Sequence, residues 1–195
     1  MKYETERVLN ELLTYLDNAD YIKAGDIPNI DLYMDQVTTF MENSLKTTKR
    51  HPEDKIMTKT MINNYAKNDL LPPPQKKKYN KEHLMLLIYI YYLKSILSIS
   101  DIDKLLKPMR EEYFGTKKDG VSTEDIYSAT FSEIKKMLPR FKKEIESCVK
   151  LSDDFKKDLS SDSDYLDFLS LITMLSADIY IKKQLIERLI DMMPD

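Results

Sequence analysis

The chain has 195 residues and a formal net charge of −3, with 3 glycines, one cysteine and no tryptophan. This length suits one domain, or a small domain with a helical companion, and can bury a core without metals or disulfides. The few glycines argue against glycine-rich phosphate loops, and the single cysteine excludes an internal disulfide.

The longest apolar run, residues 84–93, holds ten residues, whereas a membrane-spanning helix needs roughly 20. The chain starts KYETERVLNELL after Met1, without the apolar core of a secretory signal. The lone Cys148 favours a reducing compartment. We therefore expect a cytoplasmic protein that does not span a membrane.

The first 57 residues predict two helices separated by a break. Residues 3–18 repeat apolar side chains at the spacing of an amphipathic helix. Residues 24–29, with a glycine and a proline, interrupt this pattern. Asp31 is a suitable cap for the second helix, and residues 47–55 then predict a polar loop. The apolar positions of the second helix are Leu32, Val37, Phe40, Met41 and Leu45.

The next segment predicts a polar helix that stops at a proline run. Thr58 is a good N-cap for a helix that ends near Asn68. The three prolines 72–74 cannot continue that helix. Lysines 76–78 follow them in an exposed, extended segment that is suited to a small hairpin.

A very apolar helix comes next. Asn80 can cap it, and residues 84–93 are apolar on almost every face, so this helix should be central and buried. Ser98 or Ser100 opens a short helix that runs through Leu106. Ser100 and Asp103 have the spacing of a capping box.

The remaining residues predict a linker and two long helices. Gly115 and Gly120 lie in the linker, Ser122 opens the first long helix, and Asp164 opens the second after a polar break. The expected fold class is all-α. The expected divisions are an N-terminal helix (1–25), a DNA-binding domain (26–108), a linker (109–121) and a C-terminal dimerisation or effector module (122–195).

Basic charge is concentrated in the middle of the chain. Residues 1–45 carry 3 Lys/Arg against 9 Asp/Glu, residues 46–99 carry 11 against 4, and residues 100–195 carry 16 against 20. A polyanion responds to the local field, because screening acts over about 8 Å at physiological salt. The +7 segment is therefore the candidate nucleic-acid contact.

Two features of that segment suit DNA. Lys59, Asn63 and Lys67 share one face of the Thr58 helix, with Thr60 and Asn64 beside them. Lysine neutralises phosphates and asparagine can pair with adenine. Each feature alone is more often just a solvated surface, but the helix followed directly by a lysine triplet favours a winged helix-turn-helix. The candidate DNA-binding residues are Lys59, Thr60, Asn63, Asn64, Tyr65, Lys67, Lys76, Lys77 and Lys78.

Residues 65–106 resemble the DNA-binding half of MerR-type winged helix-turn-helix regulators. Those proteins carry a tyrosine on the recognition helix, then Gly-Leu-Leu-Pro, a wing, Arg-x-Tyr and a closing Ser-Leu-x-Glu-Ile. This chain has Tyr65, residues 69–72 (Asp-Leu-Leu-Pro), residues 77–79 (Lys-Lys-Tyr) and residues 98–102 (Ser-Ile-Ser-Asp-Ile). Asp69 replaces the turn glycine, and Asp tolerates left-handed backbone better than most residues.

The MerR resemblance implies roles for individual residues. Tyr65 and Lys77 would contact the DNA backbone, and residues 59, 60, 63 and 64 would face bases. Tyr79 would pack the wing onto the core. The connection before Thr58 is longer than a helix-turn-helix normally has, and the family's arginines are replaced by Asn63 and Lys77.

A wider stretch resembles a bacterial helical family catalogued as domain of unknown function 1836. The resemblance spans residues 27–106, through IPNIDLYMDQVTTFME, MTKTMINNYAKNDLLPPPQKKKY and LKSILSISDIDKLL. It implies a bacterial cytosolic protein and no particular activity.

The sequence offers little catalytic chemistry. His51 falls in a polar loop and His83 at a helix start, and Cys148 lies on an apolar helix face with no histidine near it in sequence. No Cys/His spacing suits zinc. The tyrosines Tyr89, Tyr91 and Tyr92 could line a ligand pocket, but core packing is the more common use. We expect neither an enzyme nor a cofactor.

Two functions remain. The first is a transcriptional regulator that binds double-stranded DNA as a homodimer formed through its C-terminal helices, because one helix and one wing cover only a half-site. The alternative is a protein-interaction module that keeps a winged-helix shape without binding DNA. The acidic flanks and the missing arginines favour that alternative.

Overall fold

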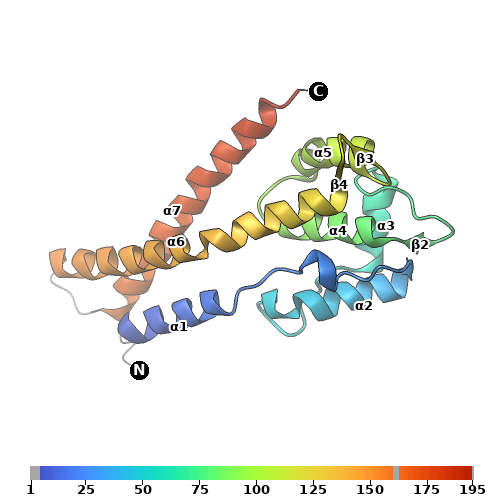
Figure 1. Cartoon of the computed structure of the whole chain (residues 1–195). Coiled ribbons are helices and arrows are strands. Elements are labelled where there is room, and N and C mark those ends of the chain that lie inside the picture. The colour runs from blue at the N-terminus through green and yellow to red at the C-terminus, as the bar shows by residue number, and fades with distance from the viewer. Residues whose placement is uncertain (1–4, 160–162, 195) are drawn as a thin grey trace. The chain divides into compact units, whose positions relative to one another are not determined.

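The computed structural model describes residues 5–159 and 163–194, whose contacts form two compact units. The long-helix unit combines Met1–Tyr21 with Ser132–Ile186, and the central unit combines Ile22–Phe131 with Glu187–Asp195. Helices make up most of the described chain, alongside two very short sheets (Figure 1). The all-α expectation is therefore confirmed.

The central unit opens with a short turn and a strand. The 3-10 helix η1 (Ala24–Asp26) precedes strand β1 (Leu32–Tyr33), and helix α2 (Met34–Leu45) follows at once. Asp31 does not cap α2 as expected, because β1 comes between them. Tyr33 occupies the cap position instead, and its N–H donates to Gln36 Oε1 at 2.8 Å.

Helix α3 (Lys59–Lys67) begins at the predicted cap. The Thr58 hydroxyl accepts a hydrogen bond from the Met61 N–H at 3.2 Å, which satisfies a donor of the first turn. The short 3-10 helix η2 (Lys46–Thr48) directly follows α2. Strand β2 (Lys78–Tyr79) runs antiparallel to β1, with Leu32 opposite Tyr79 and Tyr33 opposite Lys78.

Helix α4 (Lys81–Leu93) is the centre of this unit. All six residues from His83 to Ile88 are buried, and so is Ile90. The prediction of a buried helix is therefore confirmed. Helix α5 (Ile99–Pro108) follows from the Ser98 start, and its capping box pairs Ser98 with Asp101, so the expected box of Ser100 and Asp103 was wrong. The Asp101 N–H donates to Ser98 Oγ at 3.1 Å, and the Ser98 N–H donates to Asp101 Oδ2 at 3.2 Å.

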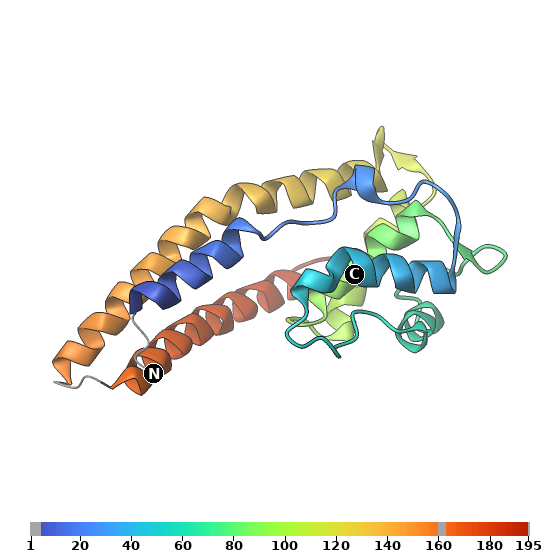
Figure 2. The ribbon, with the colours of Figure 1, turned by 90° about the horizontal axis from the view of Figure 1, so that it is seen from below.

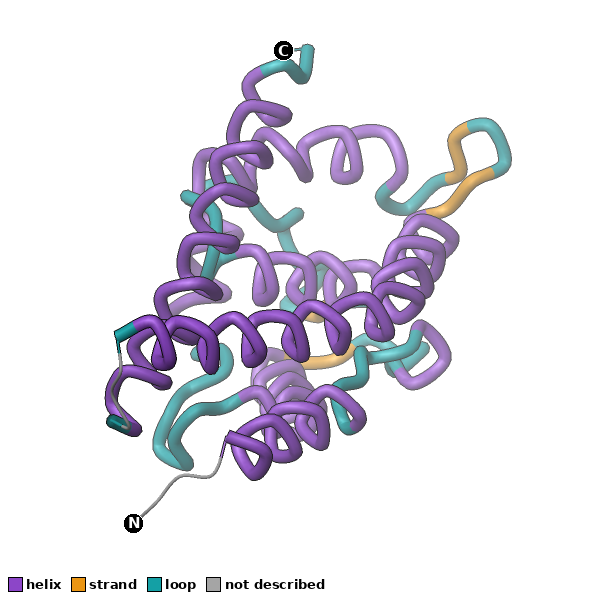
Figure 3. Tube along the Cα trace, turned by 90° about the vertical axis from the view of Figure 1, so that its left-hand side faces the viewer, coloured by secondary structure: helices purple, strands orange, loops and turns teal. Residues whose placement is uncertain are grey.

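The expected linker 109–121 is ordered. It holds a π-helical turn, η3 (Met109–Tyr113), and a hairpin of strands β3 (Lys117–Lys118) and β4 (Val121–Ser122), shown in orange in Figure 3. The two turn residues Asp119 and Gly120 have φ values of 53° and 81°. An Asp-Gly pair favours such a two-residue hairpin turn, and this was the signal that the linker interpretation overlooked.

The start of α6 (Thr123–Asp158) belongs to the central unit. Tyr127 is fully buried, and its hydroxyl donates to the Ile22 carbonyl at 2.5 Å. Its ring and that of Phe131 lie 5.8 and 5.3 Å from Tyr89, and Phe131 lies 5.6 Å from Tyr92. These α4 tyrosines thus serve core packing. The first segment of this unit runs to Phe131, inside α6, and so extends past the boundaries expected at 108 and 122.

The long-helix unit contains α1 (Thr5–Asp17), the rest of α6, and α7 (Asp164–Asp191) as far as Ile186. An ion pair joins Lys142 of α6 to Asp17. The buried Ser152 donates to the Asp167 carbonyl at 2.9 Å and links α6 to α7. The N-terminal helix thus packs with the C-terminal helices. None of the described helices has the length and apolar character needed to cross a membrane.

Candidate nucleic-acid interface

Helix α3 separates a buried side from a polar one. Ile62 is fully buried and Tyr65 is 8% exposed. The polar side is exposed throughout and consists of Lys59, Thr60, Asn63, Asn64 and Lys67. The structure therefore presents five of the nine predicted DNA-binding residues together on one short helix.

Tyr65 is placed differently from its neighbours. It lies on the buried side of α3, and burial raises the pKa of its phenol. Its carbonyl accepts a hydrogen bond from the Leu71 N–H at 3.2 Å. Tyr65 thus helps to anchor the end of α3, together with the fully buried Leu70 and Leu71.

The segment Pro72–Lys78, here called the lysine loop, follows this anchor. The Lys78 N–H donates to the Gln75 carbonyl at 2.9 Å and closes a tight turn. The two central residues, Lys76 and Lys77, have φ values of 49° and 65°, so they form the turn and not the extended segment that was expected. Left-handed backbone costs an ordinary residue roughly 1–2 kcal/mol, so two lysines hold a conformation that glycine and asparagine adopt more easily.

The backbone is also left-handed just after the end of α3, before the lysine loop. Asp69, which stands where the MerR pattern has glycine, has a φ of 57°. The expectation that Asp would tolerate this conformation is therefore confirmed. Asn68 closes α3, since its N–H donates to the Asn64 carbonyl at 3.0 Å. The chain can thus turn sharply from α3 toward the prolines.

The start of α2 contacts both α3 and the lysine loop. Asp35 forms an ion pair with Lys59 of α3. The Lys78 ammonium lies 5.1 Å from the centre of the Tyr33 ring, within the range of a cation–π interaction. These contacts and the β1–β2 pairing fix the lysine loop and α3 to one corner, residues 33–35, here called the β1–α2 corner.

Figures 1 and 2 show α3 and the lysine loop at the same end of the central unit. Lys76 and Lys77 are exposed at the loop's tip and Lys78 is half-buried. Within the described chain, no ion pair involves Lys67, Lys76 or Lys77. Three cationic side chains at this end therefore remain available to an anionic partner.

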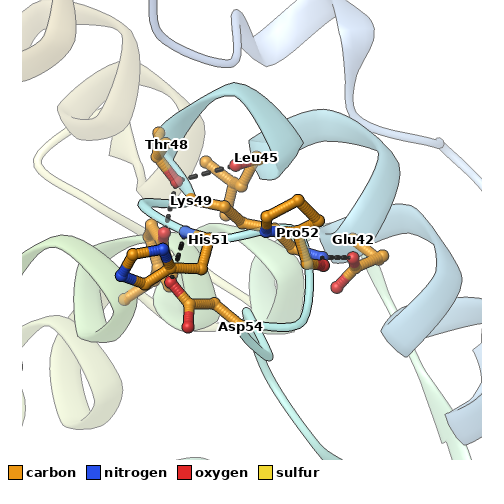
Figure 4. A network of polar contacts seen from close by, with 8 residues as sticks. Glu42, Leu45, Thr48, Lys49, His51, Pro52 and Asp54 are labelled. Carbon is orange, nitrogen blue, oxygen red and sulfur yellow. Dashed lines mark hydrogen bonds and ion pairs between the residues drawn. The ribbon is translucent and has the colours of Figure 1, made fainter.

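The connection from α2 to α3 is long, but polar contacts order it (Figure 4). Lys49 forms an ion pair with Glu42, which lowers the pKa of that carboxyl. The His51 N–H donates to Asp54 Oδ2 at 2.9 Å, and the Lys94 ammonium donates to the Ile56 carbonyl at 2.9 Å. The buried Ile56 and Met57 then lead into the Thr58 cap.

Comparison with known families gives one result. The family described as "Domain of unknown function (DUF1836)" matches residues 22–130, more than half of the chain. The chain belongs to this family. The matched residues nearly coincide with Ile22–Phe131 of the central unit. The DUF1836 region thus contains α3, the lysine loop and the ordered segment 109–121. A search of curated proteins and a search of solved structures found no match.

The described part of the chain holds no cluster of three or more His, Cys, Asp or Glu side chains suited to a metal ion. His83 is 2% exposed and packs edge-on between the rings of Tyr79 and Phe114, at 5.4 and 4.8 Å. Burial lowers its pKa. Cys148 is half-buried and its pKa is raised by burial, which disfavours a reactive thiolate.

Two residues of the candidate interface were not predicted from the sequence. Asp35 and Tyr33 were assigned no role there, yet they contact the cations of α3 and the lysine loop. The β1–β2 pairing joins residues more than 40 positions apart, so no local pattern points to it. The alternation of Leu32 and Tyr33 before a helix is too short to predict a strand.

Proposed function

We propose that this DUF1836-family chain is a transcriptional regulator that binds double-stranded DNA through a MerR-like winged helix-turn-helix in its central unit. The observation that carries the proposal is the β1–α2 corner. It holds a polar helix face and a loop of lysines at one end of the unit. A helix in the major groove and a wing on the adjoining phosphates need this combination.

The order of the helices and strands along the chain supports the same proposal. A strand, α2, α3, a loop, a second strand paired with the first, and then α4 and α5 follow one another. In this proposal α2 supports α3, α3 is the recognition helix and the lysine loop is the wing. The ordered α2–α3 connection replaces the short turn of other helix-turn-helix proteins.

Each polar residue then has a role. Lys67, Lys76 and Lys77 neutralise phosphates, and Lys59 does so after leaving Asp35. Asn63 and Asn64, with Thr60, face base edges. Lys78 supports the wing from above the Tyr33 ring. Tyr65, which is 8% exposed, holds α3 in the core and leaves little of its surface for a backbone contact.

A single recognition helix and wing cover only a half-site, so the proposal includes a homodimer. The C-terminal helix α7 supplies exposed apolar residues for it, in the long-helix unit. Among them are Ile172, Ile179, Ile181 and Leu185, each more than half exposed. A dimer would place two α3 helices on one pseudo-symmetric operator.

The test starts with genome-wide footprinting of the full chain, followed by binding of the recovered DNA over a range of salt concentrations. K67Q and K77Q should each reduce the salt slope by about one. N63A should relax the preference at one base pair by about 1–3 kcal/mol. K107Q removes an exposed lysine of α5 and serves as the matched charge control. Absent or unselective DNA binding at low salt would overturn the proposal.

A second candidate is a protein-interaction module with the same architecture. Two observations favour it: Asp35 already pairs with Lys59, and an apolar groove of about 370 Å³ lies along α2, lined by Pro28, Leu32 and Phe40 among others. The DNA assay separates the two candidates. A protein module predicts weak, unselective binding that K67Q and K107Q reduce equally.

A further inference from the structure

The central unit contains an open hollow of about 610 Å³ that neither α3 nor the lysine loop lines. Three parts of the fold meet there: the loop before β1, the first turn of α4, and the β3–β4 hairpin with the start of α6. Its size falls within the range of small-molecule sites. All of its lining residues lie inside the DUF1836 match.

Most polar groups at this hollow already have partners in the protein. Lys81 pairs with Glu124 at 2.7 Å. Glu82 accepts the Gly115 N–H at 2.7 Å. Asp125 accepts hydrogen bonds from the Ser122 N–H and hydroxyl, at 2.9 and 2.6 Å, which also lowers its pKa. These groups shape the walls and have little remaining capacity for a ligand.

Two side chains of opposite charge at this hollow differ from those paired groups. Asp31 stands in the loop before β1, and Lys117 stands on β3. Within the described residues, no hydrogen bond or ion pair engages either side chain, and they do not pair with each other. Asp31 acts electrostatically on His83, and Lys117 acts electrostatically on Asp125. Asn29 and Ser128 line the same hollow with equally unengaged polar groups. The exposed Ile30 lines it with an apolar side chain, and the fully buried Met85 lies beneath its surface.

We propose that this hollow binds a small zwitterionic molecule of the amino-acid or short-peptide class. The ligand's ammonium group pairs with Asp31 and its carboxylate pairs with Lys117, while an apolar side chain lies against Ile30. A zwitterion contacts both charged side chains at once, whereas a simple anion or cation contacts only one of them. The site stands whether or not the chain binds DNA, because it uses none of the proposed DNA-binding residues.

The test uses the full chain with ¹³C-labelled methionine methyl groups, and the Met85 signal is assigned with M85L. Leucine and alanylleucine serve as zwitterions of two lengths. N-acetylleucine lacks the ammonium group and leucinamide lacks the carboxylate. We expect a saturable shift of the Met85 methyl signal with at least one zwitterion. We also expect affinity weaker by about tenfold or more for both blocked forms, since each loses a charge-assisted contact.

Substitutions of the two charged residues test whether the ligand binds in the hollow. D31N and K117Q should each weaken binding of the zwitterion by about tenfold or more. K118Q, next to Lys117 but outside the hollow, and D119N should leave it unchanged. The unliganded methionine spectrum shows that each variant is folded. The proposal is overturned by the lack of a saturable shift up to about 10 mM for both zwitterions. It is also overturned if a blocked form binds as well, or if D31N and K117Q behave like K118Q.

Discussion

At the scale of single residues, Asp35 restrains the proposed interface. It pairs with Lys59 on a surface where both side chains are largely exposed. An exposed ion pair contributes about 0.2–1 kcal/mol to stability. This interaction is lost when Lys59 leaves Asp35 to bind a DNA phosphate. We therefore expect D35N to tighten DNA binding by up to about fivefold at low salt, measured by fluorescence anisotropy.

The matched comparison is D54N. It removes a carboxylate that bonds the His51 N–H in the α2–α3 connection, outside the β1–α2 corner. D54N should leave DNA affinity nearly unchanged. Equal effects of D35N and D54N would show that general charge, and not release of Lys59, sets the affinity.

The second residue is His83, a buried histidine whose protonation should change the stability of the fold. Burial lowers its pKa below 6.5, against the opposing influence of the Pro73 and Pro72 carbonyls and of Asp31. Nδ1 of the ring lies 3.1 Å from the Asn80 N–H and 2.6 Å from Asn80 Oδ1, so burial, and not the loss of one hydrogen bond, is what disfavours the protonated ring. The folded state thus binds protons less readily than the unfolded state near this pH.

The folded state should therefore lose stability as the pH is lowered. The contribution of neutral His83 to stability is fully present above pH 6.5 and is lost as the pH falls through 6.5 toward the lower folded pKa. Urea unfolding at pH 7.5 and pH 5.5 should show this loss in the wild type and less of it in H83Q. H51Q, which changes an exposed histidine, should retain the full loss.

At the scale of elements, the lysine loop combines backbone strain with charge. Replacing its left-handed pair by the favoured turn sequence, K76N/K77G, should raise the free energy of unfolding by about 1 kcal/mol or more. The same change removes two phosphate contacts, so the salt slope of DNA binding should fall by about 1.8. Chemical denaturation and salt-dependent anisotropy measure the two effects.

K76Q/K77Q separates strain from charge. It removes the same two charges but keeps side chains that resist left-handed backbone. Its DNA affinity should match that of K76N/K77G, without the gain in stability. If both double variants bind DNA as the wild type does, the lysine loop is not a wing.

Some features of these elements could be predicted from the sequence, and others could not. The Thr58 and Asn80 caps and the buried α4 were predictable, because each depends on residues close together in the chain. The lysine turn was not, since its positive φ values oppose the preferences of lysine. The hollow was not predictable either, because Asp31, Glu82 and Lys117 come from segments that only the fold brings together.

At the scale of the whole molecule, the proposal makes α7 the helix that lets the regulator occupy two half-sites. Ile181 and Leu185 lie four positions apart, on one side of the helix, and are 58% and 57% exposed. Burying such side chains in a dimer contributes about 1.5–3 kcal/mol each. We expect a homodimer by sedimentation velocity, and I181E/L185E should weaken it by more than about 100-fold.

T173E adds one negative charge at an exposed polar position of α7 and should leave the dimer intact. I181E/L185E should also shorten the DNase footprint to a single half-site, because each monomer keeps one α3 and one lysine loop. A wild-type chain that sediments as a monomer yet protects a full palindrome would contradict dimerisation through α7. It would place the contact between subunits elsewhere, because two recognition helices on one operator still require two copies of the chain.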